Sequence, residues 1–467
     1  MDFAAYDFWI KPIGLLRIGT VLKENGYSVH LLDCLDRNHP MLLAYLRLRE
    51  ARSRADGTGH FFKTEIEKPD VIKWVPRKYS RYGLPFQIVQ DYLFSIPEPD
   101  VILMTSGMTY WYPGVVEMIA LLRTMWPVVP VVLGGIYATL MPDHAGTVSG
   151  ADYVITGTGE KQCLNLVQEL TGQETGDIDR SEDGYRRPLY NLYPKLFTAA
   201  LLSSRGCPYQ CPFCASKQLN ETYHSYDPAD VAEEVIDLNT RHFVKHFAFY
   251  DDALLFEKES HIIPLLREIV SHGPRAAFHT PNGIQPRMID ETVAGLMYSA
   301  GFMTIRLSYE TGNPERQRSM GMKITDDDLK RAVKLLESAG FLRENLGAYV
   351  IMGLPGQPVA EVLSSIAFVM GLGIRVYLAS FSPVPGTQSW QDAVASGLMK
   401  ENIDPLLTNN SVFPLQKSRN GYDCLVKLGS LVSWGNQLIL EKRKPFNESE
   451  FIDAMRTIEQ NSSTEQG

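Results

Sequence analysis

The first 170 residues alternate between short apolar runs and longer stretches in which apolar positions recur at helical spacing. This alternation is typical of βα units, in which each buried parallel strand is followed by a covering helix. The predicted strands span residues 27–33, 100–106, 128–134 and 151–156, and the predicted helices span 13–25, 113–125 and 161–170. The pattern predicts a doubly wound, Rossmann-like parallel α/β sheet over residues 1–170. Each predicted strand ends in glycine or small polar residues, where ligands bind in such sheets.

Two features depart from a regular doubly wound domain. Residues 1–9 (MDFAAYDFW) lead directly into the first helix, so we expect the first strand of the sheet to be missing. Residues 37–99 interrupt the alternation with a long, partly basic insertion, which is interpreted either as a lid or as a solvated surface excursion. Residues 171–195 are a predicted linker, because 171–187 are polar and contain glycine.

A second alternation of strands and helices occupies residues 196–393. Its six predicted strands span residues 199–203, 247–250, 276–279, 304–308, 347–351 and 377–380. Helices such as 228–239, 290–299 and 326–339 fall between them. Six βα repeats predict a partial (β/α)6 barrel rather than a second flat sheet. Residues 394–467 are expected to be mainly helical, with a disordered polar tail at 461–467.

The composition restricts the class of protein. At 467 residues, with 45% hydrophobic and 21% charged residues, the chain is expected to form two or three globular domains. Its net charge of −9 argues against a broad nucleic-acid interface. No apolar run approaches the length of a membrane span, and no basic segment leads into an apolar one at the N-terminus. We therefore predict a cytoplasmic protein.

Three of the six cysteines, Cys207, Cys211 and Cys214, fall within eight residues directly after a predicted strand. A loop with these gaps lets three sulfurs converge on one metal centre. Because a fully protein-ligated [4Fe–4S] cluster uses four thiolates, three would leave one iron open to another ligand. Structural zinc, with a residue such as His224 as fourth ligand, is the alternative. Cys34, Cys163 and Cys424 are interpreted as small buried residues.

The string Cys-x3-Cys-x-Phe213-Cys resembles the signature of the radical S-adenosylmethionine (SAM) superfamily. The wider string 202–208 (LSSRGCP) is similar to the branch with an N-terminal cobalamin-binding domain. Later motifs at predicted strand ends arrive in the order expected for this branch. They are 250–252 (YDD), 281–283 (PNG), 308–312 (SYETG), 352–356 (MGLPG) and 382–387 (SPVPGT).

The resemblance implies a [4Fe–4S] cluster on the three cysteines and SAM bound at the open iron. It places the Phe213 backbone near the adenine side of SAM, and Asp251 or Asp252 at the methionine amino group. Glu310 falls where a polar residue meets the ribose, and Gly353–Pro355 falls where the backbone approaches the adenine. The alternative interpretations are a helix cap for the aspartates and a simple turn for the Gly-Leu-Pro-Gly string.

The resemblance also implies cobalamin at the strand ends of the first domain. The residues that fall there are Gly134, Gly135, Thr139, Thr156, Gly157, Gly159 and Glu160. Glycine is required where a large ligand approaches the backbone closely, and residues 106–113 (SGMTYWYP) are placed to supply an aromatic wall. Tight βα turns are the alternative. The Asp-x-His-x-x-Gly string that supplies a histidine ligand to cobalt does not occur in the sequence.

Three functional hypotheses follow from the resemblance and the cysteine loop. The first is cobalamin-dependent radical SAM methylation of an unactivated carbon or phosphorus. The second keeps these cofactors but performs cyclisation, ring contraction or rearrangement. The third is a non-enzymatic metal-binding or electron-transfer protein. The enzyme would act on a small-molecule or peptide substrate and receive electrons from flavodoxin or ferredoxin, with neither a membrane nor a nucleic-acid partner. No residue that contacts the substrate is identifiable from the sequence.

Overall fold

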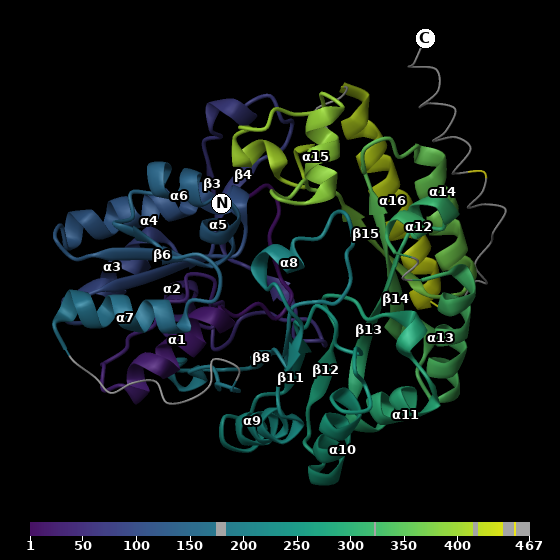
Figure 1. The fold of residues 1–467 in the computed structure, drawn as a ribbon, viewed down its shortest axis with the longest axis horizontal. Coiled ribbons are helices and arrows are strands. Elements are labelled where there is room, and N and C mark those ends of the chain that lie inside the picture. The colour runs from purple at the N-terminus through teal and green to yellow at the C-terminus, as the bar shows by residue number, and fades with distance from the viewer. Residues whose placement is uncertain (174–183, 322–323, 414–418, 442–452, 454–467) are drawn as a thin grey trace.

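A computed structural model of the chain describes residues 1–173, 184–321, 324–413, 419–441 and 453. They form two lobes, each built on a parallel sheet (Figure 1). The predicted α/β class is therefore confirmed. The centre of the predicted linker, 174–183, and the predicted tail lie outside the described residues.

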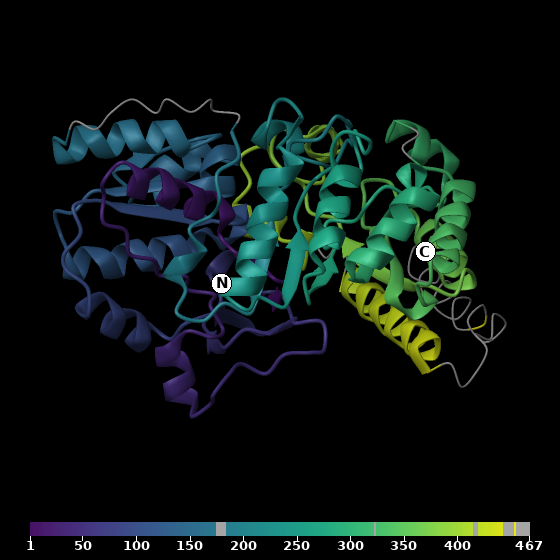
Figure 2. The same ribbon diagram turned by 90° about the horizontal axis from the view of Figure 1, so that it is seen from below.

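Three parallel strands form the sheet of the N-terminal lobe, in the order β5 (Ile102–Ser106), β6 (Val131–Gly134) and β7 (Tyr153–Val154). The central strand is apolar because both of its faces are covered. Val131 and Leu133 pack on one side of the sheet and Val132 on the other. Figure 2 shows helices on both sides of this sheet. They are α1 (Ile13–Glu24), α4 (Tyr112–Met125), α5 (Gly135–Leu140), α6 (Pro142–Val148) and α7 (Glu160–Thr171).

The predicted strand at 27–33 is wrong, because this segment joins no ladder in the described part of the chain. A strand forms only beside a second backbone that can exchange hydrogen bonds with it, and β5 pairs only with β6. Residues 6–7 (β1, Tyr6–Asp7) pair antiparallel with β2 (Gly59–His60) instead of entering the sheet. Segment 27–33 is held by side chains: the hydroxyl of Tyr92 donates to the Leu31 carbonyl (2.8 Å).

The insertion at 37–99 is a packed part of the fold and not a solvated excursion. Its β3 (Lys63–Ile66) and β4 (Tyr79–Tyr82) form an antiparallel hairpin. Ile72, Val75 and Tyr79 are buried together with Phe3 from the N-terminus and with Leu406 and Val412 from the C-terminal region. The insertion thereby joins the two ends of the described chain. Its helices are α2 (Pro40–Leu46), the 3-10 helix η1 (Asp70–Ile72) and α3 (Phe86–Phe94).

The second lobe is the predicted partial barrel of six parallel strands, which are hydrogen-bonded in chain order. The strands are β8 (Thr198–Leu201), β11 (His246–Phe249), β12 (Ala277–His279), β13 (Phe302–Glu310), β14 (Leu346–Met352) and β15 (Arg375–Ser380). The helices on the outer side of this curved sheet are α9 (Pro228–Arg241), α10 (Ile262–His272), α11 (Glu291–Ala300), α13 (Asp326–Ser338) and α14 (Val359–Gly371) (Figure 1).

The outer face of the barrel sheet carries a stack of phenylalanines. The rings of Phe247, Phe249, Phe278 and Phe302 lie 5.5–6.0 Å apart between centroids, and all four are buried. Burying each ring contributes roughly 1.5–3 kcal/mol. Side-chain caps fix where α9, α11 and α13 begin. The start of α13, for example, is a capping box of Thr325 and Asp328.

The C-terminal region closes the edge of the barrel. Helix α16 (Arg419–Glu441) packs along β15, the last strand of the sheet (Figure 1). The side-chain amide of Asn436 accepts a hydrogen bond from the Val376 N–H (2.9 Å) and donates one to the Val376 carbonyl (2.8 Å). A side chain thus satisfies backbone groups that an exposed edge strand would leave unpaired. Helix α15 (Gln388–Ala395) precedes this region, whose described part contains η6 (Pro405–Thr408) and α16 as its helices.

Candidate active site

The three clustered cysteines lie on one loop at the carboxyl end of the first barrel strand. The loop runs from β9 (Ser204–Arg205) to α8 (Ser216–Leu219), and its base is closed by pairing of β9 with β10 (His224–Ser225). Gly206 has a φ of +70°, and a Cβ there would meet the Thr222 carbonyl oxygen at 2.4 Å. Glycine is required at this position because no other residue tolerates both constraints.

The loop brings the three thiols to one place in the chain but does not preform a metal site. Cys207 is buried, Cys211 is half-buried and Cys214 is exposed. Across the described ranges, no group of three His, Cys, Asp or Glu side chains is arranged to hold an ion, whether for a cluster or for the alternative zinc site. Three sulfur donors on a short loop, with neutral thiols elsewhere, match the donor set of a three-cysteine iron–sulfur cluster.

Of the other described cysteines, Cys163 is buried as the sequence predicts, whereas Cys34 is half-buried. Burial raises the pKa of both Cys34 and Cys163 to about 12, and neighbouring carboxylates add to the effect. Both are therefore neutral thiols at physiological pH, whereas a metal ligand must be a thiolate. The side chain of Cys424 lies outside the described part of the chain.

Asp251 supports the cysteine loop from beneath. Its side chain is buried, and its Oδ1 accepts hydrogen bonds from the hydroxyls of Ser203 (2.8 Å) and Ser204 (2.6 Å). Asp252 is exposed and accepts a hydrogen bond from Ser216, the first residue of α8. The two predicted candidates for the SAM amino group therefore differ in exposure: Asp251 is buried and Asp252 is exposed.

Glu310 lies beside the cysteine loop at the end of β13. Cys211, Ser308 and Glu310 line one small cavity. The register of β13 shifts between Ser308 and Glu310, and Glu310 has a φ of +69°. A non-glycine residue in the left-handed region costs of order 1–3 kcal/mol and is concentrated at functional sites. The fold thus holds a strained carboxylate next to one of the predicted cluster ligands.

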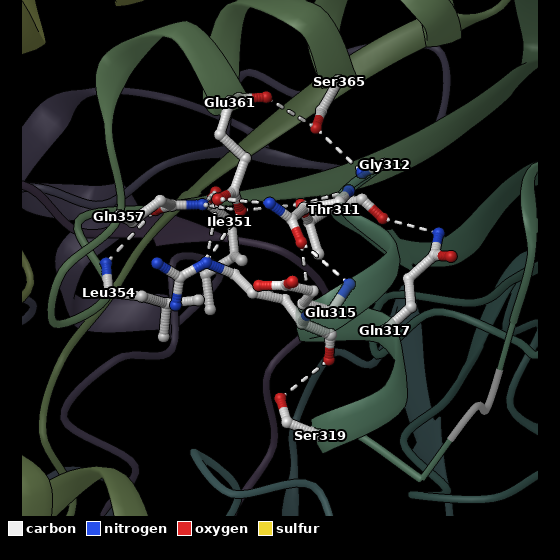
Figure 3. Close-up of polar contacts among 12 residues, drawn as sticks. Thr311, Gly312, Glu315, Gln317, Ser319, Ile351, Leu354, Gln357, Glu361 and Ser365 are labelled. Atoms are coloured by element: carbon white, nitrogen blue, oxygen red, sulfur yellow. Dashed lines mark hydrogen bonds and ion pairs between the residues drawn. The ribbon is translucent and has the colours of Figure 1, made fainter.

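One carboxylate that sequence reasoning missed, Glu361, ties together two of the strand-end motifs (Figure 3). Its side chain accepts hydrogen bonds from Thr311 Oγ1 (2.9 Å), Gln357 Nε2 (3.2 Å) and Arg316 Nε (2.9 Å). Gln357 in turn accepts from the Leu354 N–H (3.2 Å). The loop after β13 and the Gly-Leu-Pro-Gly loop after β14 are therefore held as one unit. A glutamate in the first turn of the helix after a glycine-rich loop was the available signal.

Other strand-end motifs are joined in the same way. Asn282 donates its side-chain amide to the Tyr250 carbonyl (2.6 Å), which links the third motif to the second. The Phe213 side chain packs in an apolar cluster with Ile351 and Leu354, so the cysteine loop rests on the Gly-Leu-Pro-Gly loop. Gly353 has a φ of +87°, a conformation that glycine adopts without strain.

The glycine-rich strand ends of the N-terminal lobe form a second edge. The Gly157 N–H donates to Thr139 Oγ1 (2.9 Å), which joins the loop after β7 to helix α5. A Cβ on Gly157 would meet no atom within 4 Å, so the space beside it is open. At Gly135 a Cβ would lie 2.2 Å from Thr105 Oγ1, so packing alone requires glycine there.

This glycine-rich edge faces the cysteine loop of the other lobe. Helix α5, which begins at Gly135, contacts α8, the helix that follows the cysteines. Glu160, predicted to line cobalamin, lies 3.7 Å from the Arg205 guanidinium of the barrel lobe. Segment 106–113 is predicted to form an aromatic wall, but two of its aromatic residues have structural contacts. Tyr110 is buried, and the Trp111 indole N–H donates to the Asp2 side chain (2.8 Å).

Comparisons with known proteins agree with both lobes. Residues 201–369 match the radical SAM superfamily, and residues 90–167 match the B12 binding domain. An uncharacterized methyltransferase of Pyrococcus horikoshii is 27% identical over 333 residues, which cover 65% of this chain and 71% of that protein. None of the described helices is long and apolar enough to cross a membrane.

Two solved structures share the fold. The radical SAM methyltransferase TsrM of Kitasatospora setae has a TM-score of 0.61 at 20% identity, covering 83% of this chain and 73% of its own. The cobalamin-dependent radical SAM enzyme OxsB has a TM-score of 0.52 at 12% identity, covering 81% and 73%. The chain is a radical SAM enzyme. It combines a radical SAM domain with an N-terminal B12 binding domain, and a [4Fe–4S] cluster, SAM and cobalamin are the cofactors implied.

Proposed function

We propose that the protein transfers a methyl group from SAM to an unactivated carbon or phosphorus of a small-molecule or peptide substrate. The observation that supports this reaction is the meeting of the two cofactor edges. The glycine-rich edge and the cysteine loop contact each other through α5 and α8, and Glu160 and Arg205 form an ion pair across the junction. Methyl transfer that uses both SAM and cobalamin requires both to face one reaction space.

In this proposal, different residues of the barrel lobe bind the cluster and the separate parts of SAM. Cys207, Cys211 and Cys214 supply three thiolates and leave one iron for SAM. The exposed Asp252 carboxylate is placed for the SAM amino group, and Glu310 for the ribose hydroxyls. The glycine-bearing loop at 353–355, with the Phe213 backbone, receives the adenine.

At the glycine-rich edge, backbone atoms rather than charged side chains would make most of the contacts with cobalamin. The strand-end loops that contain Gly134, Gly135, Thr139 and residues 156–160 let a corrin approach closely. When bound, the cluster supplies the electron that breaks a sulfonium C–S bond of SAM, and cobalamin carries the methyl group between SAM and substrate. The protein needs a reductant, which we propose to be flavodoxin or ferredoxin in the cytoplasm. Its substrate is a small molecule or a peptide.

The test is anaerobic reconstitution followed by quantification of products from SAM and dithionite. Methyl transfer yields S-adenosylhomocysteine together with 5′-deoxyadenosine. Cyclisation, ring contraction or rearrangement yields 5′-deoxyadenosine alone. Replacing Cys207, Cys211 or Cys214 by Ala should abolish cluster binding and both products, whereas Cys163→Ala should retain them. A reconstituted wild-type protein that leaves SAM intact would exclude the proposed function.

A further inference from the structure

The N-terminal segment Tyr6–Trp9, which we term the strap, lies inside the barrel lobe. Trp9 is fully buried, and its ring stacks on His279 of β12 with centroids 4.1 Å apart. Its indole N–H donates to the Asp56 carbonyl (2.6 Å). The hydroxyl of Tyr250, at the end of β11, donates to the Phe8 carbonyl (2.6 Å). The strap therefore forms part of the wall of the barrel lumen.

Arg306 projects from the middle of β13 toward the same lumen. Side chains alternate along a strand, and Ile305 and Leu307 are part of the core between the sheet and its helices. Arg306 lies on the other face, 4.9 Å from the Phe8 ring centroid and 4.5 Å from that of Tyr377. It is 7% exposed. A charged guanidinium is thus enclosed by aromatic rings.

This buried cation has no anionic partner among the described residues. Its Nη1 donates to the hydroxyl of Tyr349 (2.8 Å), which donates to the Pro281 carbonyl (2.5 Å). Its Nε has no hydrogen-bond partner in the described structure. The acidic side chain of the strap, Asp7, is ion-paired with Arg37 instead (2.7 Å). Aromatic faces offset part of the cost of burying a cation, but an unsatisfied N–H still costs about 1–3 kcal/mol.

We propose that Arg306 binds the carboxylate of the substrate, and that this substrate is a small carboxylic acid with an apolar or aromatic body. The proposal rests on the proposed function, because it places the acid within reach of the SAM site. Ser308, the next lumen-facing residue of β13, lines the cavity that contains Cys211 and Glu310. It stands two residues, ~7 Å, farther along the strand than Arg306. The rings of the strap and of Tyr377 supply an apolar surface for the rest of the molecule.

A carboxylate at Arg306 has two sources, the substrate and SAM itself, and the experiment separates them. The reconstituted, unreduced protein is titrated with 3-phenylpropionate and with its uncharged analogue 3-phenylpropionamide, with binding followed by ligand-observed NMR. The wild type should bind the acid at least tenfold more tightly than the amide. Arg306→Met should remove this preference, and Arg306→Lys should weaken binding of the acid about tenfold, because a point charge replaces a planar donor. Arg241→Met, which removes an exposed arginine on α9, should keep the preference.

A parallel measurement follows the binding of SAM in the same unreduced samples. The Kd for SAM should be unchanged in Arg306→Met. A raised Kd for SAM with an unaltered preference for the acid would assign Arg306 to SAM and overturn the proposal. Equal binding of acid and amide by the wild type would also overturn it, since the guanidinium would then only pack against the rings. Failure of the dithionite-reduced wild type to cleave SAM would overturn the proposed function, whereas a preference for the acid that Arg306→Met removes would still support the carboxylate site.

Discussion

Asp251 and Asp252 are adjacent in the chain, and their side chains have opposite environments. The Asp251 carboxylate is buried under the cysteine loop, where the hydroxyls of Ser203 and Ser204 donate to it. Asp252 is exposed near the first turn of α8. A buried carboxylate that accepts hydrogen bonds stabilises the fold. Without it, its donors would be buried with no hydrogen-bond partner, which costs free energy. An exposed carboxylate at a strand end is available to a ligand.

Asparagine substitutions should separate these two roles. Asp252→Asn should raise the KM for SAM about tenfold or more, because a hydrogen bond to a charged group contributes about 1.5–3 kcal/mol. Its thermal stability should match the wild type. Asp251→Asn should instead lower the free energy of unfolding by about 1–3 kcal/mol. Thermal unfolding and SAM-dependent 5′-deoxyadenosine formation measure the two effects. A raised KM in Asp251→Asn with none in Asp252→Asn would reverse the assignment.

At the scale of elements, side chains of one helix hold two of the strand-end loops. The Glu361 side chain is 6% exposed and joins α14 to the loops after β13 and β14. Ser365, one turn further along the same helix, accepts a hydrogen bond from the Gly312 N–H (2.9 Å). A helix behind the sheet thereby fixes the backbone of two loops that the proposed function assigns to SAM.

Glu361 is therefore expected to position the SAM site without contacting SAM. Glu361→Ala should raise the KM for SAM at least tenfold, because Thr311, Gln357 and Arg316 lose their common acceptor. Glu361→Gln keeps one carbonyl acceptor and should recover a large part of the affinity. The matched control is Glu315→Gln, which alters an exposed glutamate in the same region. If Ala and Gln at position 361 lowered stability alike and left the KM for SAM unchanged, Glu361 would have only a structural role.

At the scale of the whole molecule, a buried polar network joins the two lobes next to the cysteine loop. Arg17 of α1 donates to the Tyr226 hydroxyl (2.9 Å) and to the Leu202 carbonyl (3.1 Å) of the barrel lobe. Tyr185, from the segment between the lobes, donates to Glu234 of α9. Burial raises the pKa of Glu234 to about 7, with Tyr185 and Arg17 acting in the opposite direction. The junction of the lobes thus contains a carboxylate that titrates near neutral pH.

The raised pKa of Glu234 predicts a pH-dependent stability. In the folded state this carboxyl keeps its proton up to about pH 7, whereas in the unfolded chain it loses the proton near pH 4.5. Protonated Glu234 therefore contributes its full stabilisation below pH 4.5. As the pH rises to 7, the free energy of unfolding falls by at most about 3 kcal/mol. Glu234→Gln should remove this slope and be the more stable protein at pH 8.

Urea unfolding at pH 5, 6, 7 and 8 gives the difference in unfolding free energy between the wild type and Glu234→Gln at each pH. This comparison is needed because burial also raises the pKa of Asp36, to about 6, and Asp36 contributes its own pH dependence in both proteins. Glu233→Gln, on the exposed side of the same helix, serves as the control and should follow the wild type. An unchanged slope in Glu234→Gln would show that this group does not titrate between pH 4.5 and 7.

The sequence by itself determined the elements whose signal is local. The six barrel strands follow from apolar runs between helices, and the three cysteines are close in space because they are close in the chain. Tyr27–Asp33 shows the limit of that reasoning. Its composition is that of a strand, but a strand also requires hydrogen bonds to a neighbouring backbone, and the segment forms none with β5 in the described structure.

The tertiary structure alone decided the contacts between distant segments. No local pattern distinguishes Asp251 from Asp252, because burial depends on the serines that the preceding strand delivers. Glu361 and Thr311 are fifty residues apart, and they meet only because parallel strands end at the same edge of the sheet. Arg306 and the strap are separated by almost three hundred residues. Their contact is set by the closure of the barrel, since the energy of burying a charge depends on everything packed around it and not on its neighbours in the chain.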